Sequence, residues 1–229
     1  MLNFQQKREK MKKYLKILKK CALFNNIEDE DLLKMLTCLG AKVEFFDKKY
    51  TIIAEGNPAK YIGIVLSGKA QIIRNDYYGN RSIIAGIEPF EVFGEAFACA
   101  EVSAMPVTII ANEPCEIMLL DSRHVMHTCD KTCVFHQQLI FNLMKNLATK
   151  NILFHQKIEI MAKRSTREKL IAYLTLQAKK AHSNSFTIPF DRQELADYLE
   201  VDRSGLSAEI GKLKKEGIIE CHKNQFELL

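Results

Sequence analysis

The feature that most limits how this chain can fold is the stretch 130–162, which contains neither glycine nor proline. Apolar residues recur in it at steps of three and four, which is the period of an α-helix. The longest series forms a seam of Ile140, Met144, Leu147, Asn151, Phe154 and Ile158. A second stripe contains Phe135, Leu139 and Leu143. A helix with two apolar faces needs two partners, so we expect one face to pack on the rest of the chain and the seam to meet a second copy as a coiled coil. A long helix buried in a monomer is the alternative.

Residues 41–121 have a different pattern of apolar residues. They consist of short apolar runs, such as YTIIAEGNPAK and YIGIVLSGKAQII, broken by turn residues. Gly56, Gly68 and Gly79 lie in these breaks and supply turns, because glycine tolerates a positive φ. Strand-length runs spaced about 8–12 residues apart are typical of a sandwich or a small barrel. We therefore expect an antiparallel strand domain here, preceded by helical segments within residues 1–40.

Composition narrows the class of protein. No apolar run approaches the roughly 20 residues that span a bilayer. The seven cysteines are odd in number and scattered, which favours reduced thiols and a cytoplasmic location. Residues 163–229 hold 12 basic and 10 acidic residues, so charge alone does not indicate a nucleic-acid partner.

Helix signals recur close to the C-terminus, in the segment LADYLEVDRSGLSAEIGKLKKEGII. Asp191 and Glu194 fit a capping box at the start of one helix, and Asp202 fits the N-cap of a second. In the second helix, Leu206, Ile210 and Leu213 share the inward face. The residues that then point outward are Arg203, Ser204, Ser207, Ala208 and Lys212.

Two strands are expected after these helices, around a turn at Lys223-Asn224. Two crossing helices followed by a hairpin predict a winged helix–turn–helix. The second helix of such a unit fits the major groove of DNA. A small structural cap without a nucleic-acid partner is the alternative.

The order of elements resembles the cyclic-AMP receptor protein and fumarate–nitrate regulator (CRP/FNR) family of bacterial transcription regulators, over nearly the whole chain. The segments EGNPAKYIGIVLSGKAQI, FGEAF and DRQELADYLEVDRSGLSAEIGKLKKEGII carry the resemblance. It implies an α+β protein with an effector-sensing β-roll (a double-stranded jelly roll) in residues 1–129. A long dimerisation helix would occupy residues 130–162, and a winged helix–turn–helix would occupy residues 163–229. The implied partners are a second copy, double-stranded DNA with a palindromic operator, and RNA polymerase, without a membrane.

The resemblance also implies roles for individual residues of the DNA-binding unit. Positions matching Arg203, Ser204 and Ala208 commonly read bases in the family, often with Arg, Glu and Arg. This chain keeps only the first of these, so we expect its operator to differ from those of the best-known members. Arg192 and Gln193 match positions that usually hold phosphate oxygens, which position the protein without reading sequence.

The sensor residues depart from the family pattern. Gly94 and Glu95 are present, but Met105 and Pro106 stand where an Arg-Ser pair holds the phosphate of cyclic AMP. Ala96 and Val107 flank these positions. Ile152 and Leu153 occupy the places of polar groups that contact adenine. An unpaired phosphate out of water is strongly disfavoured, so we expect an unidentified effector, more apolar or lacking a phosphate, or a vestigial pocket.

The sequence also allows alternative hypotheses about cofactors, metal binding and the class of partner. Cys21 and Cys38 are too few and too far apart for the iron–sulfur cluster found in some members, so no cofactor is expected. One hypothesis concerns Cys129, Cys133 and His136, whose helical spacing would let them sense oxidation or bind a soft metal. The preferred interpretation is that Cys133 is simply one of the apolar residues of the helix, so no metal site is expected. All six histidines lie outside residues 41–121, which disfavours an enzyme that binds a metal in the roll. A sensor module that acts through a protein partner is a further alternative.

Overall fold

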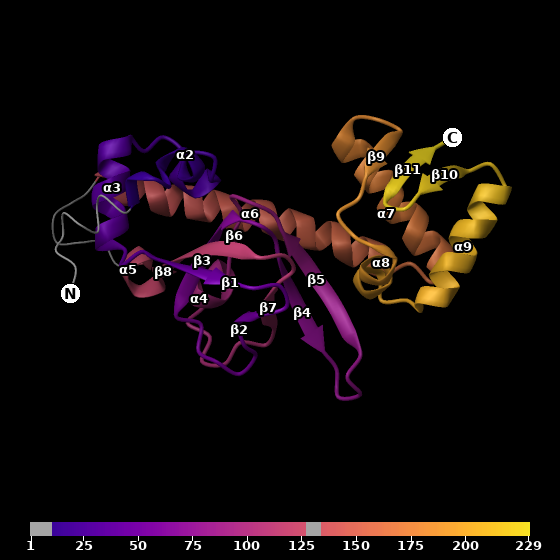
Figure 1. Cartoon of the computed structure of the whole chain (residues 1–229), viewed down its shortest axis with the longest axis horizontal. Coiled ribbons are helices and arrows are strands. Elements are labelled where there is room, and N and C mark those ends of the chain that lie inside the picture. The colour runs from indigo at the N-terminus through magenta and orange to yellow at the C-terminus, as the bar shows by residue number, and fades with distance from the viewer. Residues whose placement is uncertain (1–10, 127–133) are drawn as a thin grey trace. The chain divides into compact units, whose positions relative to one another are not determined.

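The computed structural model describes residues 11–126 and 134–229 and shows two compact units (Figure 1). The first unit contains residues up to Arg74 together with Ala85–Lys150. The second contains Asn75–Ile84 together with Asn151–Leu229. The expected domain boundaries after residues 129 and 162 remain predictions, and the first of them lies outside the described residues.

Short helical elements begin the described part of the first unit. They are α2 (Leu15–Leu18), the 3-10 helix η1 (Ala22–Phe24) and α3 (Asp29–Cys38). The first turn of α3 carries Asp29, Glu30 and Asp31, whose carboxylates interact favourably with the partial positive charge of a helix N-terminus. The apolar side of α3 is buried, so the helical texture expected for residues 1–40 is confirmed where the structure describes it.

Two four-stranded sheets form between residues 42 and 121. The strands are β1 (Lys42–Phe46), β2 (Thr51–Ile53), β3 (Tyr61–Ser67), β4 (Ala70–Asn75), β5 (Arg81–Ile87), β6 (Val92–Phe93), β7 (Thr108–Ala111) and β8 (Cys115–Asp121). One sheet has the order β1-β8-β3-β6 and the other β2-β7-β4-β5. The short helices α4 (Glu95–Cys99) and α5 (Ser122–Met126) follow β6 and β8. This arrangement confirms the expected strand domain.

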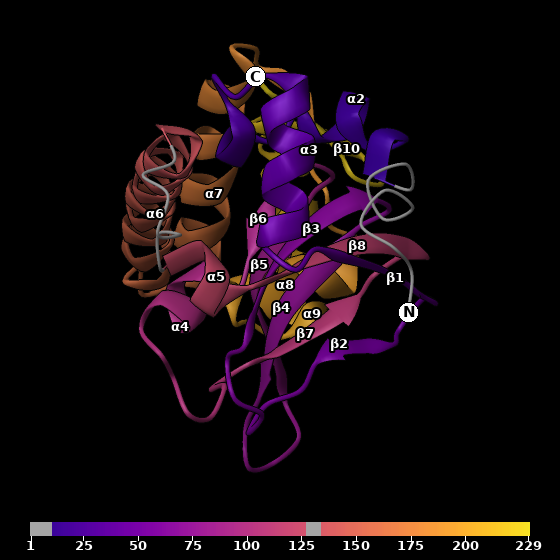
Figure 2. The same ribbon diagram turned by 90° about the vertical axis from the view of Figure 1, so that its left-hand side faces the viewer.

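Strand β3 is packed on both of its faces. Ile62, Ile64 and Leu66 belong to a buried cluster that they share with α3 and with the long helix. Val65 lies between two of them and is also fully buried, although its side chain points to the opposite face by the two-residue period of a strand. A strand that is covered on both sides has a continuous apolar sequence, whereas a strand with one exposed face alternates apolar and polar residues. Figure 2 shows α3 beside this sheet.

The long helix is present as α6 (Val134–Met161). In the first unit its residues Leu139 and Leu143 are 0% and 3% exposed and belong to the same buried cluster. The side-chain amide of Asn142 donates a hydrogen bond of 3.0 Å to the carbonyl oxygen of Leu23. One predicted apolar stripe therefore packs on the strand domain, as expected.

The second unit contains the remaining elements. They are α7 (Thr166–Ala181), β9 (Ser185–Thr187), α8 (Arg192–Leu199), α9 (Arg203–Lys215), β10 (Ile219–His222) and β11 (Gln225–Leu228). The strands form a three-stranded sheet of order β10-β11-β9. Helix α7 starts at a capping box made by Ser165 and Glu168, within the polar break between the two long helical stretches. The hairpin expected around Lys223-Asn224 is confirmed.

The architecture is α+β, with a strand roll, a long helix and a winged helix–turn–helix, and it confirms the expected fold class. Within residues 11–126 and 134–229, no helix combines the length and the apolar character needed to cross a membrane.

Gly68 and Gly56 form a matched pair for testing the turns of the roll. Both have a positive φ, of 73° and 83°. A Cβ at Gly68 would lie 2.2 Å from the carbonyl oxygen of Pro114, whereas a Cβ at Gly56 meets nothing within 4 Å. We expect Gly56→Ala to lose about 1–2 kcal/mol of unfolding free energy from backbone strain. Gly68→Ala should lose about 1–3 kcal/mol more from overpacking. Urea unfolding of the two variants checks this, and equal losses would contradict the packing of Gly68.

Candidate nucleic-acid interface and sensor site

Helix α8 begins at a complete capping box. The Asp191 carboxylate accepts a hydrogen bond of 2.8 Å from the Glu194 backbone N–H, and the Glu194 carboxylate accepts one of 2.9 Å from the Asp191 N–H. These bonds satisfy two donors that a helix N-terminus otherwise leaves unpaired. Leu195, Ala196 and Leu199 are buried on the inner side of the helix. The predicted capping box is confirmed.

Helix α9 is capped by Asp202, as predicted. The Asp202 carboxylate accepts a hydrogen bond from the Ser204 hydroxyl and one of 2.8 Å from the Gly205 backbone N–H. These bonds hold the pKa of Asp202 below its ordinary value, the Ser204 bond having the larger effect. Glu200, at the C-cap of α8, has a φ of 51°, which turns the chain sharply between the two helices.

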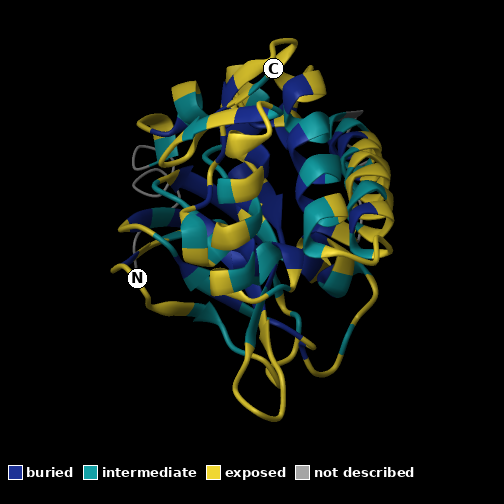
Figure 3. Ribbon diagram, turned by 90° about the vertical axis from the view of Figure 1, so that its right-hand side faces the viewer, coloured by how far each residue is buried: buried dark blue, intermediate teal, exposed yellow. Residues whose placement is uncertain are grey.

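The two sides of α9 differ as the sequence predicts. Leu206, Ile210 and Leu213 are buried on one side. The residues expected to face DNA are all exposed on the other: Arg203, Ser204, Ser207, Ala208 and Lys212. Figure 3, coloured by burial, shows helices with one buried and one exposed side. Because the exposed side chains of Ser204, Ser207 and Ala208 are short, a binding partner can come close to the helix backbone there.

The two predicted phosphate contacts have different surroundings. Gln193 is exposed, and its amide donates a hydrogen bond of 2.7 Å to Asp197. Arg192 is half-buried, with its guanidinium 5.8 Å from the centre of the Phe226 ring. Such a cation–π contact holds the arginine side chain against the protein instead of letting it extend into solvent. Gln193 is therefore the more accessible of the two.

The end of α9 is tied to the start of α7. Arg167 donates two hydrogen bonds to the Glu216 carboxylate, from Nη1 to Oε1 at 3.0 Å and from Nη2 to Oε2. This fork geometry is specific in direction. It lowers the pKa of Glu216 from its ordinary value. The pair fixes the C-terminal end of α9, and with it the direction of the exposed face.

An aromatic cluster anchors the second-unit part of α6. The rings of Phe190 and Tyr198 are 4.8 Å apart, and burial raises the pKa of the Tyr198 hydroxyl. Lys157 places its Nζ 4.0 Å from the centre of the Tyr198 ring and donates a hydrogen bond of 2.9 Å to the carbonyl oxygen of Ile84. Within this unit, α6 is thus held to α8 by a cation–π contact.

The predicted sensor residues Gly94, Glu95 and Ala96 lie where β6 ends and α4 begins. Gly94 has a φ of 76°, in the region that favours glycine. Glu95 is 2% exposed, and its Oε1 lies 2.6 Å from Nζ of Lys150. Sequence reasoning missed Lys150. The available signal was its position one heptad after Leu143, on the buried side of α6, where a lysine requires a partner.

Met105, Pro106 and Val107 offer no charge to a phosphate. Met105 is 2% exposed, and its backbone N–H and carbonyl are bonded to Asn57 and Gly56 at 2.8 and 2.9 Å. Pro106 has no N–H to donate. Glu95, the residue that would accept a ribose hydroxyl, is already paired with an ammonium. The expectation that the effector is not cyclic AMP stays a prediction.

Ile152 and Leu153, expected to line the same pocket, belong to the second unit and are 61% and 44% exposed. The first unit contains the other residues expected at the pocket. The role assigned to Ile152 and Leu153 stays a prediction.

The predicted seam of α6 is largely uncovered. In the first unit Met144 is exposed, whereas Ile140 and Leu147 are half-buried and Leu147 packs against the core. In the second unit Asn151, Phe154 and Ile158 are exposed. Phe141, which was not predicted to belong to the seam, is also exposed.

Of the residues considered for redox or metal sensing, Cys129 and Cys133 lie outside the described residues. His136 is buried, with its Nε2 2.8 Å from the carbonyl oxygen of Val125. Elsewhere in the first unit, Cys21 and Cys115 are buried thiols, and burial raises the pKa of each to about 11.

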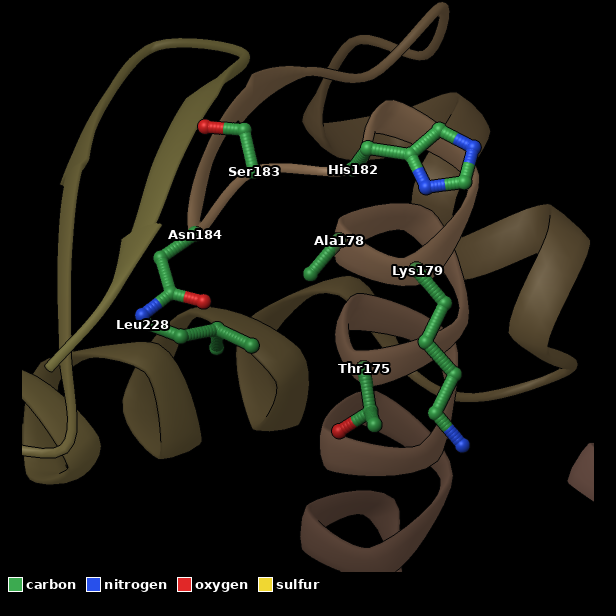
Figure 4. Close-up of a pocket in the computed structure, with 7 residues that line it drawn as sticks. All are labelled: Thr175, Ala178, Lys179, His182, Ser183, Asn184 and Leu228. Atoms are coloured by element: carbon green, nitrogen blue, oxygen red, sulfur yellow. The ribbon is translucent and has the colours of Figure 1, made fainter.

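A pocket of about 550 Å³ lies at the C-terminal end of α7 (Figure 4). Thr175, Ala178, Lys179 and His182 line it from the helix and its end, and Ser183, Asn184 and Leu228 complete it. The pocket was not predicted from the sequence. Its lining includes no residue of α9, so it is separate from the exposed face of that helix.

Comparison with known proteins agrees with this geometry. The cyclic nucleotide-binding domain family matches residues 43–132, and the Crp-like helix-turn-helix domain family matches residues 168–229. The first match covers the strand roll, and the second covers α8, α9 and the hairpin. The chain therefore combines a cyclic nucleotide-binding domain with a Crp-like helix-turn-helix domain, the combination expected from its resemblance to the CRP/FNR family of transcription regulators.

Individual relatives are distant. cGMP-dependent protein kinase 2 of Rattus norvegicus is 25% identical over 206 residues, which cover 90% of this chain but only 26% of the kinase. The transcriptional activator protein FnrL of Cereibacter sphaeroides is 21% identical over 184 residues, covering 74% of this chain and 68% of FnrL. The structure of the c-di-GMP-responsive global regulator CLP of Xanthomonas campestris has the same fold, with a TM-score of 0.71 at 15% identity, over 87% of this chain and 99% of CLP.

The thiols provide a test of the first unit. Because the thiolate is the reactive form, a pKa of about 11 leaves about one Cys115 or Cys21 thiol in a thousand ionised at pH 8. We expect both to resist iodoacetamide in the folded protein while the exposed Cys38 is alkylated. Mass spectrometry of the labelled peptides measures this. Alkylation of Cys21 or Cys115 as fast as Cys38 would contradict their burial, and urea-unfolded protein is the control.

Proposed function

We propose that the chain is a homodimeric regulator that binds a palindromic DNA operator through α9. The observation that carries the proposal is the exposed face of α9, which is capped at Asp202, buried on its other side and fixed at its end by Arg167. Arg203 lies in the first turn, where outward residues of such helices reach base edges in the major groove. A bidentate contact of Arg203 with guanine would provide sequence specificity.

The exposed apolar residues of α6 support a dimer. Phe141 and Met144 in the first unit are each 57% exposed, and Ile158 in the second is 62% exposed. Apolar residues gathered on one helix face favour a partner surface. A second copy of α6 offers the same face, and a two-fold pair would present two α9 helices to half-sites about 34 Å apart.

Short side chains on α9 support an operator unlike that of the best-known family members. Ala208 can contact the methyl group of thymine but cannot donate a hydrogen bond to a base. Ser204 is bonded to Asp202. Specificity would then come from Arg203 and from close packing against the groove. The effector would not be cyclic AMP, and RNA polymerase would be the partner through which a bound dimer acts.

Enrichment of genomic DNA fragments by the purified, reduced protein tests the proposal, at about 0.15 M salt, where non-specific phosphate binding is weakened. A palindrome with half-sites one helical turn apart supports it. No enrichment, with or without added cell metabolites, would overturn DNA binding as the function.

Removing Arg203 should weaken operator binding. We expect Arg203→Ala to reduce affinity for the enriched operator by about 5- to 150-fold, the equivalent of one lost bidentate base contact. Lys180→Ala removes the same charge from an exposed site near the end of α7 and should leave the operator affinity nearly unchanged. Fluorescence anisotropy with a labelled duplex measures both. Equal losses would show that Arg203 contributes only charge.

A charge placed in the α6 seam should separate the copies. We expect Met144→Glu to raise the dimer dissociation constant by about tenfold or more, because two like charges would meet in an apolar contact. Thr149→Glu adds the same charge at an exposed polar position of the same helix and should leave the dimer intact. Sedimentation velocity distinguishes the species, and a Met144→Glu dimer as tight as the parent would exclude this seam.

A further inference from the structure

Glu95 is a buried carboxylate that requires a partner. It is 2% exposed, although it stands at the first position of α4, directly after the left-handed Gly94. A carboxylate removed from water is strongly unfavourable unless it is paired and hydrogen-bonded. In a ligand-gated protein, an effector group could provide that partner.

The chain provides the partner itself. Lys150, on α6, places Nζ 2.6 Å from the Glu95 Oε1 and donates a hydrogen bond to the carbonyl oxygen of Val92. The carbonyl oxygen that accepts the hydrogen bond and the carboxylate of the ion pair come from consecutive elements, β6 and α4. The Lys150 side chain is 29% exposed and the Glu95 side chain 2%, so the carboxylate of the pair is the more deeply buried group.

A ligand would have to displace this pair at a cost. A group that takes the place of Lys150 at Glu95 must bring a cation or hydroxyl donors of its own. An anionic group that attracts Lys150 would leave Glu95 buried and unpaired. Met105 and Pro106, on the neighbouring segment, offer no donor to an anion, because the Met105 N–H is bonded to Asn57 and Pro106 has none.

We propose that Lys150 is a built-in substitute for an effector, so that the chain binds its operator without a small-molecule ligand. The inference rests on the proposed function. Helix α6 is continuous from Val134 to Met161 and leads to the DNA-binding unit. The Glu95–Lys150 pair fixes α6 on the roll. In a regulator with two conformations, a ligand that binds one conformation more tightly would stabilise that conformation in the same way. Breaking the pair would release the helix and lower the fraction of dimers in the DNA-binding state.

The test compares full-length variants on the operator found by enrichment. Native mass spectrometry first establishes that the purified protein carries no bound small molecule. Lys150→Met breaks the pair, and the double variant Glu95→Gln with Lys150→Met removes both charges, so that no buried charge is left unpaired. We expect the double variant to keep its thermal unfolding midpoint close to that of the parent and to bind the operator about tenfold or more weakly. Lys145→Met, an exposed lysine on the same helix, is the control and should bind normally.

Two results would overturn the inference while leaving DNA binding intact. One is a double variant that binds as tightly as the parent. The other is a parent protein that binds the operator only after a cell metabolite is added. Failure of the parent to bind any DNA under either condition would instead overturn the proposed function.

Discussion

Packing of α6 against the strand roll is the contact on which the rest of the structure depends. Leu139 and Leu143 enter the same buried cluster as Ile62 and Ile64 of β3, and each buried leucine contributes about 1.5–3 kcal/mol. The N-terminal helices cover the other part of that cluster. Without this layer the apolar outer face of β3 would lie open to water. The helix that leads to the DNA-binding unit would then have no fixed base.

The same helix carries charge on its buried side. Lys150 and Lys157 follow Leu143 at successive heptad steps, so all three share one side of α6. Each ammonium is satisfied within its own unit, the first by Glu95 and the second by backbone carbonyls and the Tyr198 ring. Such pairs are poor sources of stability compared with apolar side chains of the same size. Their value is geometric, because an ammonium with fixed acceptors permits only one register of the helix.

Local sequence signals predicted the parts of the structure that short-range rules control. The capping box at Asp191, the cap at Asp202 and the inward positions Leu206 and Ile210 depend on neighbours within one or two turns, and all are present. The Glu95–Lys150 pair was missed because its members are distant in sequence and meet only through the packing of α6. Burial of Glu95 likewise follows from tertiary structure. The family resemblance assigned Glu95 to a ligand, and the residues near Glu95 in the sequence do not indicate which lysine pairs with it.

The exposed face of α9 has a consequence for how such a protein can change over generations. Leu206, Ile210 and Leu213 hold the helix in the fold, while Ser207 and Ala208 contact solvent and contribute little to stability. If α9 binds DNA as proposed, a substitution at either exposed position would change the bases that the helix contacts and leave the fold intact. Gly211 adds to this freedom, since a side chain built there meets no atom within 4 Å. Duplicated copies of this chain could therefore acquire new target sites by single substitutions, without passing through an unfolded intermediate sequence.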